Sequence, residues 1–335
     1  MARRLLVCEY LSGGAGVVPT ATGSALAACA PTDERELLIQ GLAMRDAMVA
    51  DAAALPGIEL SCVQGPGMPT PATGRAVELR PGESLLDLVR REAVHYDRVW
   101  VVAPESDGCL LALAQVVDAW RWMGCLPDAI RLCSSKRDTL VHLAARGIAT
   151  PMAIDAHAAH WVVKPDDGAG AVDTRVHATR EAAEADVAER TAQGRAAAAL
   201  EPWVEGEALS LSLLVGGLDG ESHEAELLSV NRQRIAVDAS GMLAYRGVDI
   251  LAIGPADGRH AALRSTAAAV ARAVPGLRGF VGIDLVWHPA RGPVVIEINP
   301  RLTCAYAGLS AALGRNLAGE MLALHDDEAL AHARA

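Results

Sequence analysis

The sequence predicts an α/β domain with a parallel sheet, followed by an α+β region built on antiparallel strands. The chain has 335 residues, enough for two domains of ordinary size. In its first third, short apolar runs alternate with stretches of helical period, which is typical of a parallel sheet. Between residues 209 and 245, strand-like segments follow one another closely with turn signals between them. This spacing indicates antiparallel pairing.

The first third supplies the strands and helices of the parallel sheet. We expect strands over 5–9, 58–63 and 98–103 and helices over 34–55, 84–94 and 106–123. Ligands of such sheets bind beyond the carboxyl ends of the strands, so 9–16 and 104–108 form the expected substrate edge. The glycines at 13–16 match neither the dinucleotide fingerprint nor a P-loop. We therefore interpret that segment as a plain loop.

The character of the sequence changes after about residue 127. Helices are expected over 136–146, 180–191 and 259–274, and strands over 160–164 and 197–203, before a final hairpin. We place the domain boundaries at 1–127, 128–203 and 204–335. There are no internal repeats and no low-complexity linkers.

Composition narrows the class of partner. The chain is 51% hydrophobic and carries a formal charge of −11, so it can bury a core but lacks the basic balance that non-specific nucleic-acid binding requires. Seven cysteines without a Cys-x-x-Cys pair are typical of reduced thiols. The first residues lack the apolar run of a secretory leader, and the longest uncharged stretch is too rich in glycine and proline for lipid. We expect a soluble, cytoplasmic protein with small-molecule partners and neither a nucleic-acid nor a membrane partner.

The final hairpin carries the most informative pattern. Two β-rich runs, 282–287 and 294–299, flank a Pro/Gly turn. A turn centred between residues 290 and 291 places Asp284 opposite Glu297, and Asn299 shares the face of Glu297 because side chains alternate along a strand. Two carboxylates and an amide oxygen would then converge among apolar residues, which favours a divalent cation, Mg²⁺ above others. The alternative for either acid alone is an ion pair with an arginine, such as Arg301 or Arg232.

Three further segments have residue types suited to a nucleotide. Lys164 ends a strand and precedes a loop with glycines at 168 and 170, whose backbone N–H groups can approach an anion closely. A plain Asp/Gly turn is the alternative. Lys136 opens a helix, where a surface lysine is the ordinary interpretation. The segment 201–207 contains three glutamates around an extended strand end, which can border an adenine and a ribose.

The order of these segments resembles the ATP-grasp superfamily over roughly residues 128–305, with a pre-ATP-grasp-like α/β domain before it. The resemblance implies ATP held between two α+β subdomains and Mg²⁺, or Mn²⁺ in its place, at the metal set. It implies catalytic roles for Lys164 and Arg301, the latter facing the transferring phosphoryl group. The implied nucleotide-binding residues are Lys136, Lys164, Gly168, Ala169, Gly170, Glu201, Trp203, Val204 and Glu207, and the implied metal ligands are Asp284, Glu297 and Asn299. Many relatives place the ribose glutamate where this chain has Ala208, and Glu207 is the expected substitute.

Short motifs at 8–14, 103–108, 228–233 and 297–309 resemble the tyramine–glutamate ligase branch, which acts in methanofuran-type cofactor biosynthesis and C1 metabolism. The branch implies an ATP-dependent ligase that joins the γ-carboxylate of L-glutamate to tyramine through an acyl phosphate. Glu9, Tyr10 and Arg232 are the candidate substrate residues, with solvated loop carboxylates as the alternative for the acids. Another ATP-grasp amino-acid or dipeptide ligase and a nucleotide-binding module without turnover stay open, as does a homo-oligomer.

Overall fold

The computed structural model describes residues 2–15, 32–168, 170–216 and 224–332. It divides into two compact units. Unit 1 contains residues 1–104, 109–127 and 301–335, and unit 2 contains residues 105–108 and 128–300. Residues 301–335 thus belong to the same unit as the N-terminal residues. The three domain ranges expected from the sequence stay predictions.

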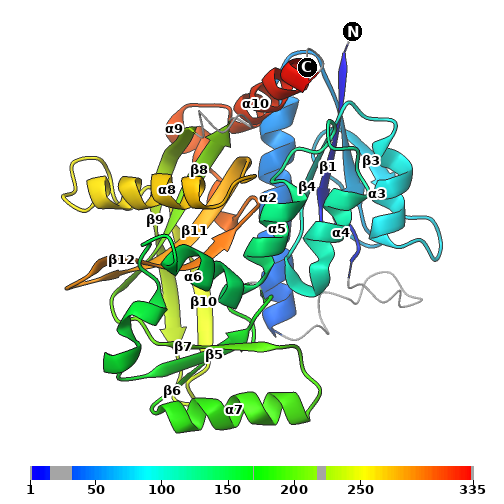
Figure 1. Cartoon of the computed structure of the whole chain (residues 1–335). Helices are drawn as coiled ribbons and strands as arrows, with labels where there is room; N and C mark the ends of the chain where they lie inside the picture. The colour runs from blue at the N-terminus through cyan, green and yellow to red at the C-terminus, as the bar shows by residue number, and fades with distance from the viewer. Residues whose placement is uncertain (1, 16–31, 169, 217–223, 333–335) are drawn as a thin grey trace. The chain divides into compact units, whose positions relative to one another are not determined.

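Unit 1 is built on a parallel sheet, as predicted. Its strand order is β3-β2-β1-β4, and all its paired strands run parallel. The strands are β1 (Arg3–Glu9), β2 (Ile58–Gln64), β3 (Arg75–Glu78) and β4 (Arg98–Val102), and the helices of this part of the chain are α2 (Thr32–Ala53), α3 (Leu85–Ala93) and α4 (Cys109–Gln115). The long helix α2 packs against β1 and β2 (Figure 1). The sequence analysis missed β3, whose four residues are too few to show an apolar alternation.

One helix predicted in the first part of the chain is wrong in its extent. The expected helix over 106–123 is a 3₁₀ turn, η1 (Ser106–Gly108), followed by α4, which ends at Gln115. The backbone around Trp122 instead forms a parallel bridge with Val99 of β4. Val99 donates its N–H to the carbonyl of Arg121 at 2.8 Å and accepts one from Met123 at 2.9 Å. Pairing with the sheet edge thus occupies the carbonyl of Arg121 and the N–H of Met123, which a continuing helix would use within itself.

The C-terminal residues return to the helices of unit 1. They form η3 (Cys304–Tyr306), α9 (Leu309–Leu313) and α10 (Leu317–His332). Both η3 and α10 pack against α2. The carboxylate of Asp51 on α2 accepts hydrogen bonds from the hydroxyls of Tyr306 at 2.6 Å and Ser310 at 2.5 Å. These contacts explain why 301–335 belong to unit 1.

Unit 2 contains two antiparallel sheets, as predicted. The three-stranded sheet, β6-β5-β7, contains β5 (Trp161–Pro165), β6 (Arg175–His177) and β7 (Ala198–Pro202), and α7 (Arg180–Ala192) lies along it (Figure 1). The helices α5 (Pro127–Ser134) and α6 (Lys136–Ala144) and the 3₁₀ segment η2 (Pro151–His157) precede it. Trp161, Val163 and Ala183 form the buried contact between sheet and helix.

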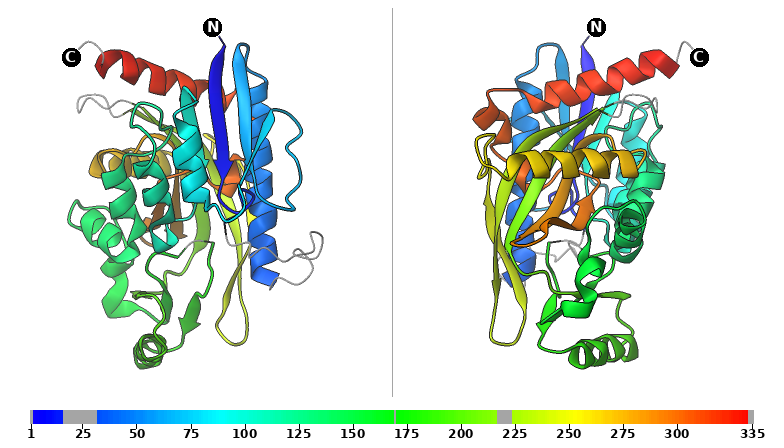
Figure 2. Two further views of the ribbon diagram at one scale, coloured as in Figure 1. Left: turned by 90° about the vertical axis from the view of Figure 1, so that its right-hand side faces the viewer. Right: turned by 60° about the vertical axis from the view of Figure 1, so that its left-hand side comes forward.

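The five-stranded sheet of unit 2 carries the predicted hairpin. Its order is β10-β9-β8-β11-β12. The strands are β8 (Glu207–Gly216), β9 (Glu224–Val237), β10 (Leu243–Asp249), β11 (Gly279–His288) and β12 (Gly292–Asn299), and α8 (His260–Ala273) lies across them (Figure 2). One of the turn signals between residues 209 and 245, the glycine-rich segment 216–220, falls largely outside the described residues.

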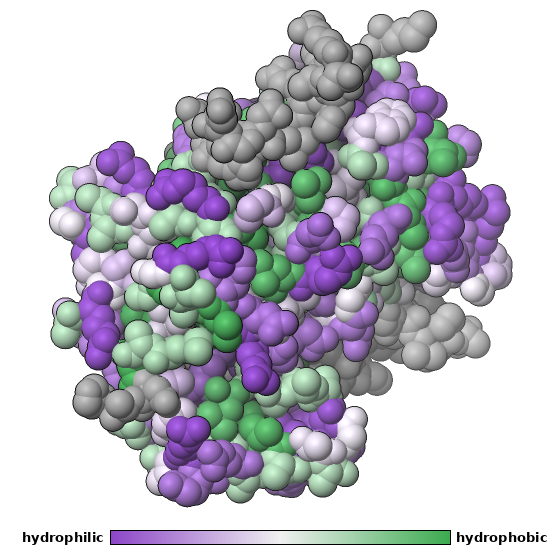
Figure 3. Space-filling model, in the orientation of Figure 1, coloured by the Kyte–Doolittle hydropathy of each residue, from purple (hydrophilic) through white to green (hydrophobic). Residues whose placement is uncertain are grey.

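The surface is mixed in character. Figure 3 shows polar residues interspersed with small apolar groups on the face in view, as is normal for a protein surface. In the described parts of the chain, no helix combines the length and the apolarity needed to span a membrane.

Candidate active site

The hairpin of β11 and β12 places two acids opposite one another. Asp284 pairs in register with Glu297, and Gly282 pairs with Asn299, as the centre of the turn predicts. Side chains of directly opposed residues lie about 5 Å apart at Cβ. A register shift follows Asp284, and a bulge of this kind commonly redirects side chains beside a functional site.

A third strand reaches the same acid. Gln233 of β9 donates from Nε2 to Oδ1 of Asp284 at 3.0 Å, and Asn299 donates from Nδ2 to Oδ2 at 3.2 Å. The sequence analysis did not assign Gln233 to the site. The signal lies in the register, because Asn231 pairs with Ser210 and Ser210 pairs with Asp284. Two residues beyond Asn231, Gln233 points to the same face as Asp284.

The donor set of the hairpin suits Mg²⁺. Asp284, Glu297 and Asn299 offer only carboxylate and amide oxygens, the hard ligands that this ion takes together with water and phosphate. Within the described residues, no three His, Cys, Asp or Glu side chains come together as a metal cluster. The protein would therefore provide a partial shell of two carboxylates and an amide, and hydrogen bonds to Asp284 would orient one of its ligands.

Lys136 links the hairpin to the loop between β5 and β6. It is the first residue of α6, whose N-cap Ser135 accepts the N–H of Asp138. Its side chain is buried, which excludes the surface interpretation, and Nζ lies 3.1 Å from Oε1 of Glu297. Nζ also donates to the carbonyl of Gly168. Two predicted segments thus meet at one ammonium group.

The charge of Lys136 is stabilised by its neighbours. Burial by itself would lower the pKa of this lysine, but the charge and hydrogen bond of Glu297 outweigh that effect. Glu105 and Glu201 add to it, and the pKa is raised. The group is therefore a cation at neutral pH inside a predominantly acidic surrounding.

Lys164 pairs with the glutamate that the resemblance assigns to adenine. Its Nζ lies 2.9 Å from Oε2 of Glu201, and both side chains are 8% exposed. Val162 is directly opposite Glu201 in the β5–β7 register, so Lys164 and Glu201 share one face of the sheet. The two side chains thus form a buried ion pair on that face.

The loop between β5 and β6, residues 166–174, is attached firmly at its start. Lys136 donates its backbone N–H to the carbonyl of Asp166 at 3.0 Å, and Arg137 donates to its carboxylate at 2.9 Å. The next residue, Asp167, accepts from the N–H of Asp107 at 2.9 Å. The predicted residues Gly168 and Gly170 follow, whereas Ala169 lies outside the described residues.

The remaining predicted nucleotide residues follow β7. Trp203 donates its N–H to the carbonyl of His160 at 2.9 Å. Val204 is buried against Ile154 and Val294. These contacts fix the chain directly after β7 through the backbone of Trp203 and the side chain of Val204.

Glu207 and Arg232, expected in separate roles, bind one another. The carboxylate of Glu207 accepts from Arg232 at 2.6 Å and from Arg259 at 2.5 Å. Burial alone would raise the pKa of Glu207, but the two arginines outweigh burial and lower it. Arg259 also places its guanidinium 5.8 Å from the ring centre of Trp287. Glu207 is thus already engaged by two arginines.

Three predicted residues lie in unit 1. The buried carboxylate of Glu9 accepts the N–H groups of Leu11 at 3.1 Å and Ser12 at 2.8 Å. Burial raises its pKa despite these bonds. The hydroxyl of Tyr10 lies 3.2 Å from Sγ of Cys109. Arg301 donates to the carbonyl of Leu302 at 3.3 Å.

The two antiparallel sheets, the two buried lysines and the acidic hairpin define a protein of the ATP-grasp class. The model of the ATP-grasp domain matches residues 133–305, and that of the pre ATP-grasp 3 domain matches residues 58–130. The first match covers more than half of the 335 residues, and the chain belongs to the ATP-grasp family.

Curated and solved relatives agree with this assignment. The chain is 26% identical over 231 residues to the tyramine–L-glutamate ligase of Methanocaldococcus fervens, a match over 67% of this chain and 65% of that protein. Its fold resembles an ATP-grasp superfamily protein from Archaeoglobus fulgidus, with a TM-score of 0.66 and 20% identity over 96% of this chain and 88% of the other. It also resembles D-alanine–D-alanine ligase from Bacillus anthracis in complex with ATP, with a TM-score of 0.62 and 14% identity over 98% and 100% of the two chains.

Proposed function

We propose that this protein is an ATP-dependent ligase that joins a carboxylate to an amine through an acyl phosphate. The observation that carries the proposal is the buried ammonium of Lys136, which contacts Glu297 of the acidic hairpin and the carbonyl of Gly168 in the β5–β6 loop. An ammonium between a carboxylate pair and a glycine-containing loop is suited to a phosphate chain that carries a cation.

The reaction needs two displacements. A carboxylate is a poor electrophile, so its oxygen first attacks the γ-phosphorus of ATP, and the bond from that phosphorus to the β–γ bridging oxygen breaks to release ADP. The amine nitrogen then attacks the acyl carbon, phosphate leaves with the bonding electron pair, and the nitrogen loses a proton to give the amide. Phosphoryl transfer depends mainly on positioning and on stabilising the charge of the transferring group.

The residues of unit 2 would supply this stabilisation. Lys136 and Lys164 would neutralise phosphate oxygens after exchanging their glutamate partners for the nucleotide. Asp284, Glu297 and Asn299 would hold Mg²⁺, which when bound offsets the charge of the phosphate oxygens. The resemblance assigns Arg301 to the transferring phosphoryl group, and Trp203 and Val204 to the adenine together with Glu201.

For the substrates, we propose L-glutamate, activated at its γ-carboxylate, and tyramine. Support comes from the similarity to the tyramine–L-glutamate ligase of Methanocaldococcus fervens. The match covers 65% of the length of that protein. Glu9 and Tyr10 would act on the substrate side. Arg232 is the third candidate, and it would have to leave Glu207 to meet a substrate carboxylate.

The test is ADP release by the purified protein with Mg-ATP, L-glutamate and tyramine, with the product identified by mass spectrometry. The expected product is γ-glutamyl-tyramine, and Glu297→Gln should abolish both readouts. Glu184→Gln is the matched control, because this glutamate of α7 has a side chain that is 56% exposed. ADP release without that product would keep the ligase and replace the substrates with those found in a screen of acids and amines. No ADP with any acid and amine would contradict the proposed activity.

A further inference from the structure

The far end of the β5–β6 loop has an unusual backbone. Gly170, Ala171 and Asp173 have φ angles of 70°, 62° and 55°. Glycine adopts this left-handed region freely, but in other residues the Cβ atom crowds the backbone. Ala171 and Asp173 therefore keep these angles only if surrounding contacts hold them.

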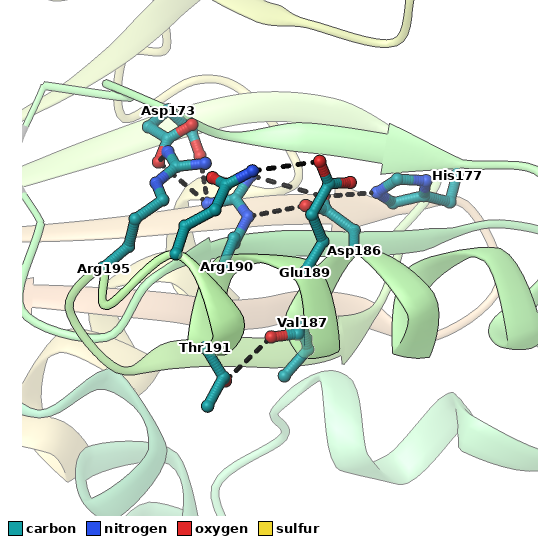
Figure 4. A network of polar contacts seen from close by, with 9 residues as sticks. Asp173, His177, Asp186, Val187, Glu189, Arg190, Thr191 and Arg195 are labelled. Atoms are coloured by element: carbon teal, nitrogen blue, oxygen red, sulfur yellow. Dashed lines mark hydrogen bonds and ion pairs between the residues drawn. The ribbon is translucent and has the colours of Figure 1, made fainter.

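A buried arginine of α7 makes the contacts that hold Asp173. Arg190 is 4% exposed, and its Nη1 donates to both the carbonyl and the carboxylate of Asp173 at 3.0 Å. Its Nε donates to Asp186 at 2.8 Å and its Nη2 at 3.3 Å. Figure 4 shows the guanidinium between the two aspartates. The bond to the backbone carbonyl matters most, because it acts on the main-chain path of the loop.

Neighbouring charges hold the arginine in turn. His177 of β6 lies 2.9 Å from Oδ2 of Asp186, and Arg195 forms a second ion pair with Asp173 (Figure 4). Burial by itself would raise the pKa of Asp186, but hydrogen bonds from Arg190 and His177 outweigh it and lower that pKa. The guanidinium of Arg190 is thus fixed in one orientation by a carboxylate on its own helix.

We propose that Arg190 is a positioning residue for nucleotide binding, which holds the β5–β6 loop through Asp173 so that the loop N–H groups face the phosphates. The inference rests on the proposed binding of ATP at this loop. Lys136 and Arg137 hold the start of the loop, and Arg190 holds its end. The glycines lie between the two attachments.

The first experiment follows the loop without any nucleotide. Hydrogen exchange of peptides covering 166–174 is compared between the wild type, Arg190→Met and Glu184→Gln. Glu184 lies on the same helix in an exposed ion pair with Arg180. We expect exchange in the loop to rise by about tenfold or more in Arg190→Met alone, as for a segment that has lost a local constraint. Unchanged exchange in this peptide would overturn the positioning role.

The second experiment separates phosphate binding from a general loss of structure. Calorimetry gives the affinities of each variant for Mg-ATP and for adenosine. Arg190→Met should weaken Mg-ATP by about tenfold, equivalent to one charge-assisted hydrogen bond, and leave adenosine unchanged. In Arg190→Lys, the ammonium can still bind Asp173 but lacks the second guanidinium edge that binds Asp186. Its affinity for Mg-ATP should lie between those of the wild type and Arg190→Met. This variant provides the test if Arg190→Met does not fold. If Arg190→Met lost affinity for both ligands to the same extent, or for neither, the inference would be overturned.

The two proposals fail in different ways. A wild-type protein that does not bind Mg-ATP would contradict the proposed function and, with it, the role of Arg190. A wild-type protein that binds Mg-ATP, together with an Arg190→Met variant that binds it equally well, would overturn only the role of Arg190.

Discussion

Lys136 is the residue on which the site depends. Its ammonium is buried and retains its charge because Glu297 lies 3.1 Å away. A buried charge that loses its partner costs far more than an exposed one. The pair therefore matters both to the folded state and to the phosphates that would displace it.

Replacing Lys136 tests both effects. Lys136→Met should destabilise the fold by about 3 kcal/mol, because Glu297 loses its buried partner, and should weaken Mg-ATP binding by about tenfold or more. Urea denaturation and calorimetry measure the two changes. Arg131→Met, on α5 with a side chain that is 55% exposed, should alter neither. A Lys136→Met variant with wild-type affinity would remove this lysine from the phosphate site.

The sign of the pH dependence follows from the raised pKa of Lys136. The stabilisation from its pair with Glu297 is fully present below the ordinary lysine value of 10.5 and is lost as pH rises through the raised value. Between pH 6 and 9, the stability difference between the wild type and Lys136→Met should therefore show no contribution from titration of this lysine. Urea denaturation across that range would reveal a step if the pKa were instead lowered.

Glu9 differs from Lys136 because its surroundings disfavour the charged form of its side chain. Burial raises the pKa of its carboxyl above 4.5, so its ionised form is disfavoured in the folded state. The wild type should lose stability relative to Glu9→Gln as pH rises from about 4.5 through the raised value. Unfolding free energies of both proteins at several pH values between about 4 and 8 give this difference. A difference that grew in favour of the wild type with pH would contradict the assignment.

At the scale of the element, helix α2 positions the contacts of unit 1. Gly41 faces the carboxyl of Glu9, and a Cβ at this position would lie 2.7 Å from Oε1. Asp51, further along the helix, accepts two hydroxyls from the C-terminal segment. One helix thus supports both the loop after β1 and the chain that follows the hairpin.

Gly41→Ala tests the first contact of α2. Alanine in a helix is ordinarily more stable than glycine by about 1 kcal/mol. Here the added methyl group meets a buried carboxylate, so we expect destabilisation instead. Thermal unfolding of Gly41→Ala gives the sign directly, and restored stability in Gly41→Ala combined with Glu9→Ala would identify the clash. A more stable single variant would show that the carboxylate moves away at no cost.

Asp51→Ala tests the second contact. Two hydroxyls that lose a charged acceptor should cost about 2–4 kcal/mol of unfolding free energy. Asp118→Ala is the control, since this aspartate is 58% exposed in an ion pair with Arg121 and should change stability by about 0.5 kcal/mol or less. Denaturant unfolding followed by circular dichroism measures both. Equal effects of the two substitutions would contradict a specific role for Asp51.

At the scale of the whole molecule, the chain has a charge of −11 and yet is proposed to bind a polyanion. The two lysines of the site are paired with glutamates, so the nucleotide must bring its own cation. The affinity for ATP should therefore fall strongly when the divalent metal is removed, because the paired lysines do not by themselves offset the charge of the phosphates.

Thermal unfolding measures this dependence. Mg-ATP at about one hundred times its dissociation constant should stabilise the fold by about 2.7 kcal/mol. ATP with EDTA should give little stabilisation, and Glu297→Gln should lose the effect of Mg²⁺. Equal shifts with and without the metal would contradict a metal site at the hairpin.

Much of the fold followed from local pattern. Most strands of both units, the helices α2, α3, α6, α7 and α8 and the antiparallel order around the hairpin were predicted from periodicity and turn residues. The opposition of Asp284 and Glu297 followed from counting outward from a turn. Such features depend on residues that are close in sequence, and the sequence alone therefore predicts them. The prediction of a helix over 106–123 was wrong because Trp122 pairs with Val99 at the edge of the sheet. That contact joins residues distant in sequence.

The sequence by itself determined which residue types were available for chemistry and in what order, and hence the class of fold and the family. The tertiary structure alone decided their partners. It paired Lys136 with Glu297, Lys164 with Glu201 and Glu207 with Arg232, and it brought Gln233 to Asp284 and Arg190 to Asp173. The physical reason is that a long side chain finds its partner through packing and burial across strands and helices, and no local spacing encodes which charge will be nearest.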